Sequence, residues 1–73
     1  MNAPYPQSDF RSRLASMSPD ELKHTMRYIG CASQQRLADR IGVSRSAVWS
    51  WCTGRVGVPR HIAMLLRLLA EAA

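Results

Sequence analysis

The sequence predicts an all-α fold, a compact bundle of four to five short helices. Apolar residues recur at the three- and four-residue spacing of one helix face in successive segments of the chain. Three of these segments are preceded by a serine and followed by a glycine, the residues that commonly begin and end helices. No segment alternates apolar and polar residues as a half-buried strand does.

The N-terminal part of the chain predicts a tail and one short helix. Residues 1–7 contain two prolines and no periodicity, which indicates a flexible tail. We expect residues 8–73 to form one domain, because a chain of this length supports a single core. Ser8 is the cap candidate of its first helix. The apolar face of that helix is formed by Phe10, Leu14 and Met17.

The next helix has the clearest start signal, and we expect it over residues 19–29. Ser18 can cap it, Pro19 suits its first position and Glu21 can complete a capping box. Gly30 is placed to end the helix in a left-handed conformation. Its apolar face is formed by Leu22, Met26 and Ile29.

Two shorter helices follow, and both carry the same end signals. Ser33 is the cap of the first, which Gly42 ends after barely two turns. Ser44 caps the second, which ends at Gly54. The inward residues are Leu37, Ala38 and Ile41 in the first and Ala47, Val48 and Trp51 in the second.

The last helix follows Val58-Pro59 and frays near Ala72. Its apolar stripe is formed by Ile62, Leu65, Leu66 and Leu69. Most of this stripe is expected to be core. Its surplus, with Ala70 and Ala73 beside it, and the apolar face of the N-terminal helix are the two candidates for a two-fold interface.

The segment from Ser33 to Gly54 predicts a helix-turn-helix. Ala38 is small enough for a close approach, and Gly42 permits a tight turn that sets the two helices at roughly 90 to 120°. Val43 then enters the core beneath the turn. The outward face of the second helix is polar, basic and aromatic, and consists of Arg45, Ser46, Trp49 and Ser50.

The charge of the chain favours a polyanionic partner. Ten basic residues oppose five acidic ones, for a net charge of +5 and a pI near 10.3. Nine of the ten cations are arginines, whose planar fork fits phosphate or the O6 and N7 edge of guanine. From Arg36 to Arg60 there are five arginines and one acid, Asp39, so most of the charge lies on the predicted binding unit.

This segment resembles the helix-turn-helix of the phage Cro and CI repressor family, and small YdaS-like or anti-CRISPR-associated regulators share the module. The resemblance covers more than half of the chain. It is carried by Leu37-Ala38, Gly42-Val43-Ser44, Val48, Trp51 and Gly54. It implies a bundle of four or five helices whose third helix reads operator DNA, usually as a dimer.

Carried over by position, the resemblance assigns two sets of DNA contacts. The residues expected at base edges in the major groove are Arg45, Ser46 and Ser50. The residues expected at phosphates are Gln34, Ser44 and Thr53, and we add the cations Arg55 and Arg40. Arg45 is the strongest base reader, because it lies at the end of the helix that enters the groove and can contact guanine bidentately.

Trp49 departs from the family pattern, since that position commonly carries a polar residue. Its indole can lie against a sugar or a thymine methyl group, and we include it among the base-contacting residues. The alternative is that it packs on the last helix or on a partner chain as hydrophobic cover.

Other classes of function find little support in the sequence. Cys31 and Cys52 are expected to be free thiols, and His24 and His61 stand alone, so no metal or cofactor is expected. No serine, cysteine or histidine has a visible catalytic partner, so we expect neither an enzyme nor a small-molecule substrate. No apolar run reaches the roughly 18 to 20 residues of a membrane span, and no targeting signal is visible, so we expect a cytoplasmic protein.

These observations predict a sequence-specific transcriptional repressor or autoregulator of phage or mobile-element type. We expect it to bind an inverted repeat in double-stranded DNA as a homodimer. The alternative is a protein-interaction module, such as an antitoxin that neutralises a partner by contact. RNA binding is less favoured, because Trp49 is the only outward aromatic residue identified, and RNA-stacking platforms usually have two or three.

Overall fold

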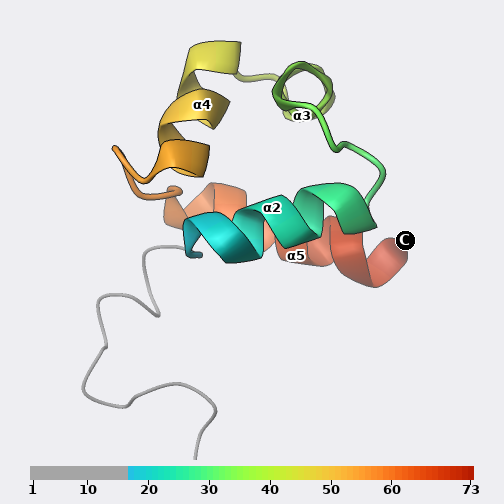
Figure 1. The fold of residues 1–73 in the computed structure, drawn as a ribbon. Coiled ribbons are helices and arrows are strands. Elements are labelled where there is room, and N and C mark those ends of the chain that lie inside the picture. The colour runs from blue at the N-terminus through green and yellow to red at the C-terminus, as the bar shows by residue number, and fades with distance from the viewer. Residues whose placement is uncertain (1–16) are drawn as a thin grey trace, which may run out of the picture.

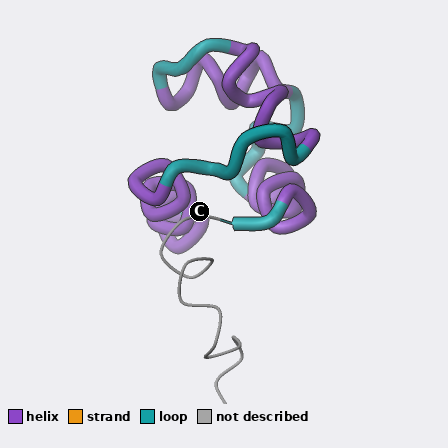
Figure 2. Tube along the Cα trace, turned by 90° about the vertical axis from the view of Figure 1, so that its left-hand side faces the viewer, coloured by secondary structure: helices purple, strands orange, loops and turns teal. Residues whose placement is uncertain are grey.

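The computed structural model describes residues 17–73, which form four helices (Figure 1). They are α2 (Pro19–Tyr28), α3 (Gln34–Ile41), α4 (Arg45–Thr53) and α5 (Arg60–Ala72). Within this range there is no strand, and loops join the helices (Figure 2). The all-α prediction is therefore confirmed. The expected tail over residues 1–7 and most of the expected helix after Ser8 lie outside the described residues.

Serine caps begin α2, α3 and α4, as the sequence predicts. In each helix the serine Oγ accepts a hydrogen bond from the backbone N–H three residues later, at 3.0 to 3.1 Å. The pairs are Ser18 with Glu21, Ser33 with Arg36, and Ser44 with Ala47. The Glu21 carboxylate, expected to complete a capping box, instead accepts from Nη2 of Arg67 on α5 at 3.0 Å. A charged partner on the neighbouring helix explains this difference.

Glycines end the same three helices in the left-handed conformation, with φ between 77° and 81°. After α3, both Gly42 N–H and Val43 N–H donate to the carbonyl oxygen of Ala38, at 2.9 and 3.0 Å. The chain thereby turns sharply and reaches Ser44, the cap of α4, within two residues.

Replacing Gly42 with alanine is expected to destabilise the domain by about 1 to 2 kcal/mol, because L-residues with a Cβ strain at positive φ. No heavy atom other than its chain neighbours lies within 4 Å of a Cβ built at Gly42, so backbone strain alone causes the loss. Urea denaturation measures it. Gly42→Asn is the control, since asparagine tolerates this conformation, and an equal loss in both variants would contradict the explanation.

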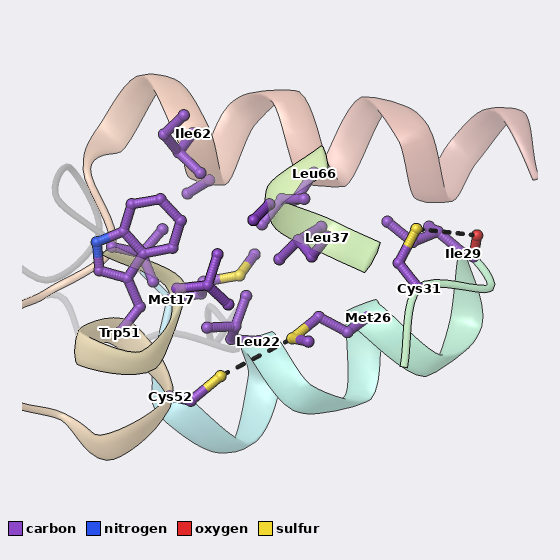
Figure 3. Packing of buried hydrophobic residues seen from close by; sticks show 14 residues of the cluster. Met17, Leu22, Met26, Ile29, Cys31, Leu37, Trp51, Cys52, Ile62 and Leu66 are labelled. Atoms are coloured by element: carbon purple, nitrogen blue, oxygen red, sulfur yellow. Dashed lines mark hydrogen bonds between the residues drawn. The ribbon is translucent and has the colours of Figure 1, made fainter. Parts of the chain in front are cut away.

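The core lies between α2 and α5 on one side and α3 with α4 on the other, an arrangement that both views show (Figures 1 and 2). Leu22 of α2, Leu37 of α3, Val48 of α4 and Leu66 of α5 are all 0% exposed. Figure 3 shows side chains from all four helices meeting in this cluster. Each described helix thus buries most of its predicted apolar face, and Ile41, Ala47 and Leu69 are partly buried against the core.

One residue of α5 departs from the predicted core stripe. Leu65 is 36% exposed, whereas Ala63 is buried at 1%. Ile62, Ala63 and Leu66 face α2, and Leu65 lies about 100° round the helix from Leu66. The prediction that Leu65 belongs to the core is therefore wrong.

Both cysteines are free, as expected, and both are buried. Burial raises the pKa of the Cys52 thiol, and nearby Lys23 opposes that rise. Cys52 Sγ lies 3.9 Å from Sδ of Met26, and this contact joins α4 to α2 (Figure 3). In the part of the chain that the structure describes, no helix is both long and apolar enough to cross a membrane.

Candidate nucleic-acid interface

The interface is built on the crossing of α3 and α4. Figure 1 shows α3 nearly end-on while α4 is seen from the side, so the two axes cross steeply. Ala38 is 1% exposed, and a larger residue there would separate the helices. Val43 packs against the core beneath the turn, as predicted.

The buried residues of α4 fix which side of it faces solvent. Val48, Trp51 and Cys52 point into the core and are at most 6% exposed. Helical geometry then directs the residues on the opposite side outward. The predicted base-contacting residues Arg45, Ser46 and Trp49 are all exposed, and Ser50, one turn after Ser46 on the same face, is half-buried.

Trp49 is 45% exposed and forms a cation–π pair with Arg55. The guanidinium carbon lies 5.6 Å from the ring centroid, within the range of such contacts. The turn after α4 holds Arg55 there, because its backbone N–H donates to the carbonyl oxygen of Ser50 at 3.0 Å. Trp49 thus remains partly open to solvent on the outward face of α4, beside Arg55.

The two hydroxyl groups expected at phosphates, those of Ser44 and Thr53, differ in whether their hydrogen is free to be donated to a phosphate. Ser44 Oγ accepts a bond from Ala47 N–H, which leaves its own hydrogen available. Thr53 Oγ1 donates back to the carbonyl oxygen of Trp49 at 2.9 Å. Thr53 must break this bond to donate to a phosphate.

Gln34 lies half-buried at the first position of α3, where helical N–H groups point outward and favour an anion. Beside it is a groove of about 350 Å³ that sequence analysis did not identify. The groove is lined by Lys23, Met26, Arg27, Ala32, Gln34 and Cys52. Lys23 and Arg27 stand four residues apart on α2, a spacing that could have indicated a shared basic face.

Arg40 stands apart from the other predicted contacts. Its Nη1 donates to the carbonyl oxygen of Ile29 at 3.4 Å and lies 3.9 Å from Sγ of Cys31. The guanidinium thus contacts the loop between α2 and α3, near the C-terminal end of α3 rather than at the Gln34 end. A phosphate contact by Arg40 remains a prediction.

The surroundings of the site leave its positive charge largely uncompensated. Asp39, the acid within the predicted binding unit, accepts a hydrogen bond from Gln35 at 2.9 Å. The ion pair found within residues 17–73 is formed by Arg67 and Glu21. It joins α5 to α2 and does not involve a cation of the site. Arg45 and Arg55 are both exposed beside α4. A basic, partly aromatic helix face of this kind fits the major groove of DNA.

Comparison with known proteins adds one finding. Residues 20–70 match the family model described as the bacteriophage CI repressor helix-turn-helix domain, and this range contains most of α2 and α5 and all of α3 and α4. No curated protein and no solved structure gives a significant match.

Proposed function

The chain belongs to the bacteriophage CI repressor helix-turn-helix domain family, a family of DNA-binding and generally non-enzymatic regulators, and on this premise we propose its specific role. It is a sequence-specific transcriptional repressor of phage or mobile-element type that regulates its own operon. It binds an inverted-repeat operator as a homodimer, with two recognition helices about 34 Å apart on one side of the duplex. Because a repressor acts where its operator lies, the proposal implies a cytoplasmic location.

The exposed face of α4 is the observation that carries the proposal. Arg45, Ser46 and Trp49 lie in its first five residues, at the end that enters the groove in helix-turn-helix proteins. These residues and Ser50 contact base edges in this proposal. The proposed phosphate contacts are Gln34, Ser44, Thr53, Arg55 and Arg40.

The groove beside Gln34 supports the phosphate contacts at the N-terminal end of α3. Lys23 and Arg27 add two cations there, and the groove reaches Cys52 of α4. Cys52 is adjacent along the chain to Thr53. Lys23 and Arg27 can therefore neutralise a phosphate of the duplex beside the N-terminal end of α3.

Salt dependence tests DNA binding in general. Affinity for duplex DNA should fall steeply between about 50 and 200 mM salt, because each neutralised phosphate releases counterions. The Arg55→Ala variant should lower the slope of log affinity against log salt by about 1, and fluorescence anisotropy measures both. A flat salt profile, or no DNA binding, would favour a protein-interaction module instead.

Trp49 should contribute preference for thymine, because its open indole surface can contact the 5-methyl group in the major groove. Replacing thymine by deoxyuridine, which lacks that methyl group, should weaken binding of the wild-type protein at one position in each half-site. The Trp49→Ala variant should show no such loss. Tyr28→Ala removes a more exposed aromatic residue from α2 and serves as the control. If Trp49→Ala responds to deoxyuridine as the wild-type protein does, Trp49 is not a base reader.

A further inference from the structure

Arg55 lies over the indole ring of Trp49, and both side chains are exposed at the proposed DNA-binding face. Within residues 17–73 the Arg55 guanidinium makes no hydrogen bond and no ion pair, so the indole is its partner there. Trp49 also departs from the polar residue usual at its position. The two unusual features of this face are therefore in contact with each other.

The backbone after α4 holds Arg55 in this place. Gly54, with a φ of 81°, ends the helix in the left-handed conformation and turns the chain. The backbone N–H groups of Arg55 and Val56 then both donate to the carbonyl oxygen of Ser50, at 3.0 and 3.3 Å. Val58, which is 2% exposed, anchors the following loop in the core. The fold thus sets the position of Arg55 before DNA binds.

The guanidinium of Arg55 can contact the indole and a phosphate at the same time. The group is planar, its faces stack on aromatic rings, and its five N–H groups lie in its plane. A guanidinium placed over the ring of Trp49 therefore keeps N–H groups free for phosphate oxygens. The ammonium of lysine has no such plane and does not divide the two contacts in this way.

We propose that Arg55 is a specificity-determining residue that acts through Trp49. Its guanidinium holds the indole in the orientation that contacts a thymine methyl group, while its N–H groups bind a phosphate of the same half-site. This role rests on the proposed function and deepens it, since it couples a phosphate contact to the choice of a base. An indole that is not held turns about two side-chain bonds and must be ordered on binding, which weakens its discrimination.

Titration of the full chain against duplexes carrying the selected site, with each thymine in turn replaced by deoxyuridine, tests the proposal. The wild-type protein should lose about fourfold in affinity at one position of a half-site, the value of one methyl group removed from water. Arg55→Lys keeps the charge and should keep the salt slope, but its loss at that position should be less than about twofold.

Lys23→Ala is the matched control for a lost cation. It removes a proposed phosphate contact on α2 and should lower the salt slope by about 1, yet keep the fourfold response to deoxyuridine. In the Trp49→Ala background, Arg55→Lys should not alter the response to deoxyuridine, because Arg55 acts through the indole. A further change in that background would contradict the coupling.

Nuclear magnetic resonance of the free protein tests the contact without DNA. The indole N–H signal of Trp49 should shift in Arg55→Lys, whereas the signal of Trp51, which is 5% exposed, should stay in place and report an intact core. An unshifted Trp49 signal would overturn the proposal.

The outcomes separate this inference from the proposed function. If the wild-type protein and Arg55→Lys respond equally to deoxyuridine, the role of Arg55 is overturned and the repressor stands. If the wild-type protein binds DNA but responds to deoxyuridine at no position, the inference falls and DNA binding stands. A wild-type protein that does not bind DNA would overturn both.

Discussion

Replacing Leu37 with alanine should leave most of the protein unfolded at 25 °C. Leu37 of α3 is 0% exposed and lies in the core cluster that side chains from all four helices form (Figure 3). Truncating a fully buried leucine costs about 2 to 5 kcal/mol, through lost burial and the cavity that remains. A core in a chain of this size rarely supplies more than about 3 to 5 kcal/mol in total. The loss is therefore comparable to the whole stability of the domain.

Circular dichroism during urea denaturation measures this effect. Arg36→Ala is the matched control, because Arg36 precedes Leu37 on the same helix and is exposed. Its capping bond to Ser33 comes from the backbone and is kept. The control should change stability by no more than about 0.5 kcal/mol. A Leu37→Ala variant as stable as the control would contradict the position of Leu37 in the core.

Replacing Arg45 with alanine should weaken binding to the specific operator by about 1 to 3 kcal/mol, or roughly 5- to 150-fold. Arg45 is exposed at the first position of α4, where its guanidinium can make two hydrogen bonds to one guanine. Preference at one base pair of each half-site should relax at the same time. Titration against the operator and against single-base variants measures both effects.

Arg45→Lys separates base reading from charge. Lysine keeps the positive charge but lacks the planar fork, so affinity for random DNA should persist while preference at that base pair falls. If Arg45→Ala weakens binding to operator and random DNA equally, Arg45 contacts phosphate and does not read a base.

The helices were predictable because their signals are local. Ser33 and Gly42 lie at the two ends of α3, and each acts through hydrogen bonds within a few residues of itself. The partner of Glu21 was not predictable in this way, because Arg67 is 46 residues away and meets it only when α5 packs on α2. The exposure of Leu65 depends on the same packing, since the position of α2 decides which face of α5 is buried.

The candidate site also combines a feature that the sequence predicted with contacts that depend on packing. The outward position of Arg45 follows from the helical period once Val48 is known to be core. The pairing of Arg55 with Trp49 depends on the turn after Gly54, and the bond from Arg40 to Ile29 depends on where α3 lies against the preceding loop. Neither contact is encoded in a spacing that the sequence displays.

Selection of bound sequences from a random DNA pool tests the central claim, that α4 reads base edges, most directly. The wild-type protein should enrich an inverted repeat with half-sites about one helical turn apart, 10 to 10.5 base pairs centre to centre, or a multiple of it. The Arg45→Ala variant should enrich the same repeat with one position in each half-site relaxed. A wild-type pool without any enriched sequence would contradict base reading by α4.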